Sequence, residues 1–153
     1  MKNATRARLL IAEQKMAVLS TQSKRHAGYP FGSVVAYALD ADLRPLLLIS
    51  ALAVHHRNIE AEARASLTMF EDEALGDPSN AARVTVMGDV HPVPEADLPE
   101  ARKAYLARHP EAEKWVHFGD FKILRMEVKD LYFIGGFGSM GWILPEDYQR
   151  AEA

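Results

Sequence analysis

The sequence predicts a mainly β, α+β domain: a small antiparallel β-barrel with short peripheral helices. Three observations predict it. β-prone segments follow one another through short polar turns, regular strand–helix alternation is absent, and helical periodicity is confined to three short stretches. Such hairpins close most economically into a barrel. We expect one domain over residues 1–153, because a chain of 153 residues is long enough for one core.

The first half of the chain is predicted to contain a helix, a strand, a loop, a two-stranded hairpin and a second helix. The apolar positions at Leu9–Ile11 and Met16 suit a helix, Gly28 and Pro30 mark the loop, and Asp40–Asp42 forms the hairpin turn. In order, the predicted elements are Thr5–Lys15, Met16–Thr21, Gln22–Pro30, Gly32–Leu39, Leu46–Ser50 and Val54–Glu62.

The second half is predicted to contain a strand, a loop, a long strand, a helix and a last hairpin. Gly88 predicts a bulge or bend in the long strand. Asp97 with Glu100 three residues later resembles a capping box, Pro110 ends the helix, and Gly135–Gly138 closes the hairpin. The elements are Ala65–Glu71, Leu75–Asn80, Ala82–Val93, Asp97–Arg108, Phe121–Val128 and Leu131–Phe137.

Composition excludes several classes of protein. The net charge of −3 gives no strongly basic footprint for nucleic acid, and no apolar run reaches the ~18 residues of a membrane span. The basic N-terminus is followed by an apolar stretch, Leu9–Ala12, that is too short for a signal sequence. The absence of cysteine excludes disulfides, thiolate metal sites and a cysteine nucleophile. We therefore expect a cytoplasmic protein with neither a nucleic-acid nor a membrane partner.

One stretch, Leu48–Asn58, combines groups that bind anions. Ser50 ends a predicted strand, and His55, His56 and Arg57 follow at the start of a predicted helix. A helix N-terminus favours anions through its unpaired N–H groups, and arginine adds a forked donor for phosphate oxygens. The stretch is either a phosphate cradle or an ordinary polar turn capped by the serine.

Three further stretches are weaker candidates. Gly28–Val34 precedes a strand with small residues that let a ligand approach the backbone, although a plain hairpin loop fits equally. Arg83 is either a ligand for phosphate or ring oxygens or a solvated edge charge. Asp120, which lies before Phe121, either orients a partner side chain or serves as a turn acid.

The pattern of reactive side chains predicts neither a metal site nor a serine nucleophile. The six histidines form no His-Glu-x-x-His motif, and no Gly-x-Ser-x-Gly occurs. The catalytic residues remain unknown at this stage. The only acid–base candidates to test are His55, His56 and Asp120.

The order of several motifs resembles the pyridoxamine 5′-phosphate oxidase-related FMN-binding split-barrel family. These motifs are Tyr29–Val34, Leu47–Ser50 with His56–Asn58, Arg64–Leu67 and Arg83–Gly88. Asp120-Phe121 with Leu124-Arg125, and Gly135–Gly138, are similar to the branch of heme-utilisation oxygenases. The resemblance covers roughly residues 8–142.

The resemblance implies a six-stranded antiparallel split β-barrel that forms a homodimer with FMN at the interface. It further implies that the chain is a flavoprotein, a small oxidoreductase of unknown substrate. The flavin phosphate would bind Ser50, His56 and Arg57, and main chain around Phe31 would border the ring. The implied cofactor-binding residues are Phe31, Gly32, Ser33, Val34, Ile49, Ser50, His55, His56, Arg57 and Arg83.

Departures from the family keep two alternatives open. The lysine and the Ser-Arg-Lys run of the pyridoxamine phosphate oxidases are replaced here, the latter by His55-His56-Arg57, so that reaction is not expected. Heme-degrading members resemble the chain more closely but bind heme through a histidine on a C-terminal extension, and no histidine follows His117. The alternatives are therefore heme binding or degradation on the same barrel, and a cofactor-free binding dimer.

Overall fold

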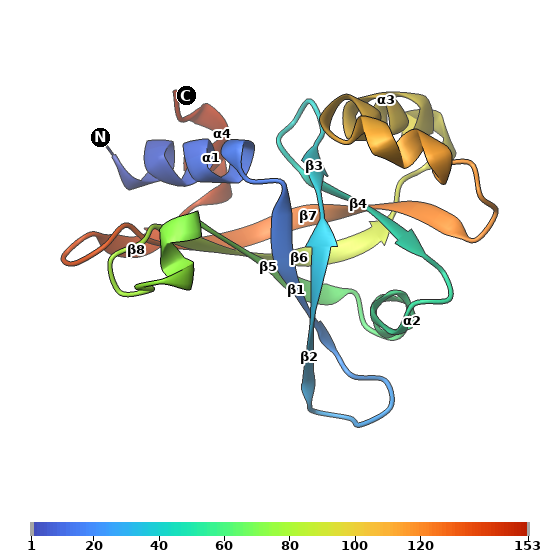
Figure 1. Ribbon diagram of the computed structural model, residues 1–153, viewed down its shortest axis with the longest axis horizontal. Coiled ribbons are helices and arrows are strands. Elements are labelled where there is room, and N and C mark those ends of the chain that lie inside the picture. Colours follow the sequence, from blue (N-terminus) through green and yellow to red (C-terminus); the bar gives the residue numbers. More distant parts are fainter. Residues whose placement is uncertain (1, 153) are drawn as a thin grey trace.

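The computed structural model describes residues 2–152 and places eight strands and four α-helices in them (Figure 1). The helices are α1 (Asn3–Glu13), α2 (Val54–Ala61), α3 (Leu98–Arg108) and α4 (Pro145–Arg150). The strands are β1 (Met16–Gln22), β2 (Pro30–Ala36), β3 (Ala38–Leu39), β4 (Pro45–Ser50), β5 (Arg64–Phe70), β6 (Arg83–Pro92), β7 (Phe121–Ile134) and β8 (Met140–Ile143). Among these residues, no helix is both long and apolar enough to cross a membrane.

All eight strands belong to one antiparallel sheet in the order β2-β1-β5-β6-β7-β4-β3, with β8 added to the far end of β7. The sheet curls around its core, and the two outer strands β2 and β3 do not pair with each other (Figure 1). The predicted mainly β split barrel is thus confirmed, with eight strands in place of six.

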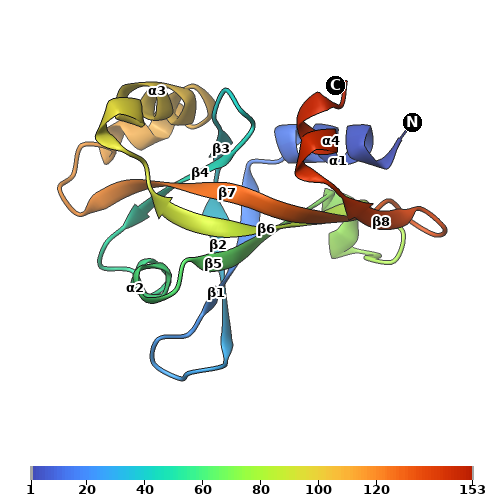
Figure 2. The same ribbon diagram turned by 180° about the vertical axis from the view of Figure 1, so that it is seen from behind.

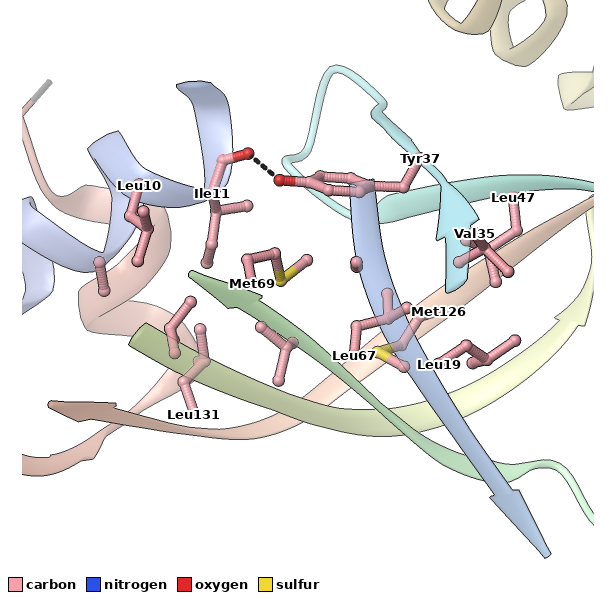
Figure 3. Close-up of a cluster of buried hydrophobic side chains, with 14 of the residues drawn as sticks. Leu10, Ile11, Leu19, Val35, Tyr37, Leu47, Leu67, Met69, Met126 and Leu131 are labelled. Carbon is pink, nitrogen blue, oxygen red and sulfur yellow. Dashed lines mark hydrogen bonds between the residues drawn. The ribbon is translucent and has the colours of Figure 1, made fainter. Parts of the chain in front are cut away.

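The main core fills the concave side of the sheet. Strand β1 shows how the sequence builds it, because alternate residues such as Ala17 and Leu19 are buried while their neighbours are more exposed. Helix α1 closes one end of the core with Leu10 and Ile11 (Figure 3). The buried Tyr37 hydroxyl donates a hydrogen bond to the Ile11 carbonyl over 2.5 Å, which fixes α1 to the strand segment.

The predicted last hairpin is wrong, because Phe121–Ile134 is one continuous strand. The polar residues after Val128 indicated a turn, but Lys129 is instead the extra residue of a β-bulge opposite Met87 and Gly88. The predicted irregularity at Gly88 is thereby confirmed, with the extra residue on β7. Gly135–Gly138 forms the turn from β7 to β8, and Gly136 and Gly138 have positive φ there.

The predicted pairing of Gly32–Leu39 with Leu46–Ser50 is mostly wrong. The segment divides at Tyr37, so that β2 pairs with β1 and only the two residues of β3 pair with β4. The capping box is also wrong. The Asp97 side chain caps no amide of α3 and instead accepts a 3.3 Å hydrogen bond from Arg125 of β7.

Candidate functional site

The polar stretch after β4 is held at the start of β7 by Ser50 and Asp120. The Ser50 hydroxyl donates to Asp120 Oδ2 over 2.8 Å and accepts the Leu52 amide over 3.2 Å. The Ala51 amide donates to the Asp120 carbonyl. Because the Ser50 hydroxyl donates its proton to a carboxylate, Ser50 stabilises the turn in this structure, and that proton is not available to an anion. Asp120 is thus bonded within the turn, which is one of the two roles that the sequence predicts for it.

Asn58 fastens the other side of α2 to β1. Its buried amide nitrogen donates to Thr21 Oγ1 over 3.1 Å, and its Oδ1 accepts the Lys24 amide over 3.0 Å. Thr21 Oγ1 in turn lies 3.4 Å from the Phe31 carbonyl of β2. Through these bonds the structure brings the predicted Phe31 segment and the predicted α2 segment to one end of the barrel.

His56 is a buried, oriented imidazole. It shares a helix face with Ile59, which belongs to the main core. Its Nδ1–H donates to the Glu60 carboxylate over 3.0 Å, while its Nε2 is buried without a hydrogen-bond partner. The carboxylate accepts only, so the imidazole is oriented with its Nδ1–H toward Glu60.

His55 and Arg57 are more accessible than His56. His55 is half-buried, and burial together with the adjacent His56 lowers its pKa below the usual 6.5. A neutral imidazole therefore predominates at neutral pH. Arg57 is exposed and makes no side-chain hydrogen bond or ion pair to any residue between 2 and 152. One accessible cation and one accessible neutral base thus occupy the first turn of α2.

The N-terminus of α2 adds backbone donors to these side chains. The first hydrogen bond from its amides runs from Arg57 to the Ala53 carbonyl, so the amides of Val54, His55 and His56 have no partner within the helix. No side chain caps this end. The amides and Arg57 are hydrogen-bond donors of the kind that anions accept, and next to them Leu52 and Val54 are exposed apolar side chains. We refer to this part of the helix as the anion-binding end predicted for α2.

The remaining predicted residues divide into three groups. On β2, Gly32 and Val34 face outward, whereas Ser33 faces the core and its hydroxyl is buried without a partner. The Ile49 side chain belongs to the core and offers nothing to a ligand. Arg83 lies at the other end of the sheet.

The position of Arg83 follows from strand register. Arg83 pairs with Ile134, whereas Ser50 pairs with Phe121, so the two partners lie thirteen positions apart along β7, or roughly 40 Å of strand. The Arg83 guanidinium donates to the carbonyl of Pro78 in its own loop and faces that of Ala81. Within one chain, Arg83 does not join the α2 site.

The sequence analysis does not identify the residues that hold α2 in position. Thr21 and Asn58 are the two polar side chains whose burial at the barrel end sets the position of α2. A signal existed, because Asn58 is followed by the apolar Ile59 on a short helix in which Arg57 and Glu60 are exposed. Within residues 2–152, no group of three or more histidine and carboxylate side chains is placed to hold a metal ion.

Comparison with known proteins identifies a matching family and a related heme oxygenase. The family described as "CREG, beta-barrel" matches residues 1–150. The chain is 40% identical over 139 residues to the non-canonical heme oxygenase HOZ, chloroplastic, of Arabidopsis thaliana, a match that covers 88% of this chain and 42% of that protein. The chain therefore spans less than half the length of this relative.

Solved structures agree with these matches. A heme binding protein from Mycobacterium smegmatis superposes with a TM-score of 0.91 at 31% identity, over 100% of this chain and 62% of that chain. A pyridoxinephosphate oxidase family protein from Clostridium acetobutylicum superposes with a TM-score of 0.72 at 11% identity, over 95% of this chain and 96% of that one, which shows the shared split-barrel fold alone. The expected split-barrel resemblance is confirmed, and the chain belongs to the CREG β-barrel family.

Proposed function

We propose that this chain is a heme-binding protein and that the heme it binds is a substrate for degradation. The observation that carries the proposal is the 40% identity to a non-canonical heme oxygenase across 88% of this chain. The heme binding protein from Mycobacterium smegmatis, with a TM-score of 0.91, supports the same reading. Heme binding therefore replaces FMN binding as the leading hypothesis for this chain.

His55 is the residue that we propose as the ligand of the heme iron. A histidine that would bind heme iron must be neutral and have an accessible nitrogen. His55 satisfies both conditions, because burial beside His56 lowers its pKa and its side chain is only half-buried. His56 fails the second condition, since its Nε2 is enclosed by protein. We therefore assign His56 to the orientation of α2 and His55 to the iron.

The groups around His55 also suit the carboxylates and the macrocycle of a heme. The heme carboxylates are anions, and Arg57 with the free amides of α2 supplies hydrogen-bond donors for them. Its macrocycle is apolar and flat, and the exposed side chains of Leu52, Val54 and Phe118 offer apolar surface near by. Leu52 and Phe118 are each two residues from the Ser50–Asp120 hydrogen bond.

FMN remains a competing ligand to be tested, with support from the fold alone. The structure related to pyridoxinephosphate oxidases is only 11% identical. The predicted anion-binding end of α2 suits a flavin phosphate as well as a heme carboxylate. The lone pair of a neutral histidine, in contrast, is useful specifically to a metal centre.

Hemin titration of single histidine variants tests the site. We expect the wild-type protein to give a Soret band with saturable binding, and His55→Ala to weaken binding at least tenfold and shift the band. His117→Ala is the matched control, because His117 is an exposed histidine outside α2 and, among residues 2–152, its side chain bonds Glu113 on a neighbouring turn alone. Equal binding by wild type and His55→Ala, or loss only in His117→Ala, contradicts the assignment.

Arg57→Ala tests the anion-binding end separately. We expect a severalfold loss of hemin affinity with an unchanged Soret position, because the iron ligand is retained. Arg150→Ala, an exposed arginine on α4, is the control. An identical loss in both variants indicates non-specific charge attraction and contradicts a site at α2.

A further inference from the structure

The loop between β1 and β2 carries two cations beside α2. It comprises residues 23–29, in which Lys24 and Arg25 are both exposed. The Lys24 amide donates to the Asn58 side chain over 3.0 Å, so the loop is bonded directly to the helix that carries Arg57. Figures 1 and 2 both show the loop next to α2 at one end of the sheet.

Lys24, Arg25 and Arg57 form a surface that we call the basic surface. None of the three makes an ion pair with a residue of the range 2–152. The acids that follow on the same chain segment, Glu60 and Glu62, are bonded to other side chains. The basic surface therefore presents three accessible charges of one sign to the solvent.

The opposite end of the sheet is acidic. Residues 71–80 contain four acidic side chains and neither lysine nor arginine. Strand β5 separates the two ends, because α2 precedes its first residue, Arg64, and the acidic segment follows its last residue, Phe70. In Figure 2 the acidic segment lies at the far end of the sheet from α2. An anionic partner is thus attracted to one end of the chain and repelled from the other.

We propose that the basic surface is the docking site for an acidic electron-carrier protein that reduces the bound heme. This docking presupposes the proposed function, because oxidative opening of a heme by O2 consumes electrons. In the step proposed here, one electron passes from the reduced carrier to the ferric iron. The carrier is oxidised by one electron, the iron becomes ferrous, and no bond forms or breaks. The 153 residues contain no cysteine, so they hold neither a dithiol nor a cysteine-bound iron–sulfur cluster as their own electron source.

The basic surface lies beside the proposed iron ligand. His55 precedes Asn58 by three residues on α2, and side chains at this spacing are neighbours on a helix, with about 5–6 Å between their Cβ atoms. Asn58 in turn accepts the amide of Lys24. A carrier that contacts Lys24 and Arg25 therefore docks next to His55, where electron transfer to the iron covers a short distance.

Three cations suit an acidic protein better than a membrane or a nucleic acid. Segments that bind anionic lipid carry about four to eight lysine and arginine residues, and nucleic acid requires a basic face or stripe. Electron-transfer complexes, in contrast, have small interfaces and form through charge attraction. Tyr29 at the end of the loop is 69% exposed and adds an aromatic side chain of the kind that is enriched in protein interfaces.

Reduction of the hemin-loaded protein by an acidic carrier tests the docking. The probe is a reduced [2Fe–2S] ferredoxin of net negative charge, mixed without oxygen, and the Soret band reports the reduction. We expect the second-order rate constant for wild type to fall at least about tenfold between about 10 and 300 mM salt. The double variant Lys24→Glu, Arg25→Glu should be slower by at least about tenfold at low salt.

A second double variant controls for net charge. Lys103→Glu with Arg150→Glu changes the charge by the same amount at exposed positions of α3 and α4, and we expect its rate constant to stay within about threefold of wild type. All rates are compared at saturating hemin. A chain without saturable hemin binding contradicts the proposed function and this proposal with it. Hemin binding with equal rate constants for the two double variants contradicts this proposal alone.

Cross-linking of the hemin-free protein gives a readout that does not depend on heme reduction. A carbodiimide joins a lysine amine directly to a carboxylate of a bound acidic protein. Wild type is expected to couple to the ferredoxin, Lys24→Gln to give severalfold less product, and Lys103→Gln to couple like wild type. Equal coupling of the two variants, or no coupling of wild type at low salt, overturns docking at the basic surface.

Discussion

Asn58 and Thr21 join α2 to β1 through a buried hydrogen bond of 3.1 Å between Asn58 Nδ2 and Thr21 Oγ1. The same asparagine accepts the Lys24 amide, so one side chain fixes a helix, a strand and the start of the β1–β2 loop. The position of His55 and Arg57, three and one residues before Asn58, depends on this bond.

Asn58→Ala is expected to lower the free energy of unfolding by about 1–3 kcal/mol, because it leaves the buried Thr21 hydroxyl and the Lys24 amide without their partner. Urea denaturation measures the change. Asn80→Ala, at an exposed loop position, is the control and is expected to stay within about 0.5 kcal/mol of wild type. A similar value for both variants contradicts the anchoring of α2 by Asn58.

Gly88→Ala is expected to destabilise the fold by about 1–3 kcal/mol or more, because an added Cβ lies 2.2 Å from the Glu127 carbonyl oxygen of the neighbouring strand. Backbone cannot move aside as a side chain can. Gly141→Ala in β8 is the matched control, since its Cβ meets nothing within 4 Å. Thermal unfolding of the two variants gives the comparison, and an equal melting temperature shows that the bulge at Met87/Gly88 is not as described.

Hemin affinity is expected to fall as the pH drops below the pKa of His55. The folded protein lowers this pKa below 6.5 through burial and the adjacent His56, so the neutral ligand persists at mildly acidic pH. The affinity of wild type should therefore be constant from pH 8 to about 6.5 and decrease below it. The weak residual binding of His55→Ala should lack this decrease. A parallel decrease in both proteins assigns the effect to another group.

Alkaline pH is expected to destabilise the protein through buried tyrosines. Burial, with a smaller contribution from Glu111, raises the pKa of Tyr105 from 10.0 to about 12. The unfolded chain releases this proton first, so its stabilising effect is complete below pH 10 and decreases as the pH rises towards 12. Melting temperatures between pH 9 and 11.5 should fall less steeply for Tyr105→Phe than for wild type. Parallel curves contradict burial of the phenol.

Strand identity and the split-barrel class were predictable because short apolar runs bounded by polar turns are typical of strands. Met16–Thr21 and Leu46–Ser50 are such runs, and both are strands within two residues of the predicted bounds. The failures lie where pairing depends on distant residues. Nothing local in Val128-Lys129-Asp130 distinguishes a turn from a bulge, since the difference is set by Gly88 on the neighbouring strand.

The candidate site was predictable in its side chains but not in their roles. The run His55-His56-Arg57 indicates the site, yet only the packing of α2 shows that His56 is enclosed while its neighbours are accessible. The sequence indicates Ser50 as well, but its proton is directed to Asp120, seventy residues away in the chain. Motif order groups Arg83 with these residues, whereas the register of β7 separates it from them within one chain.

The most direct measurement is a pair of equilibrium titrations of the purified protein, one with hemin and one with FMN, followed by absorbance and by thermal unfolding. A ligand that binds the folded state raises the melting temperature. We predict a saturable Soret band at one heme per chain, a higher melting temperature with hemin, and no change with FMN. Saturable binding of FMN without a Soret band on adding hemin contradicts the account and restores the flavoprotein hypothesis.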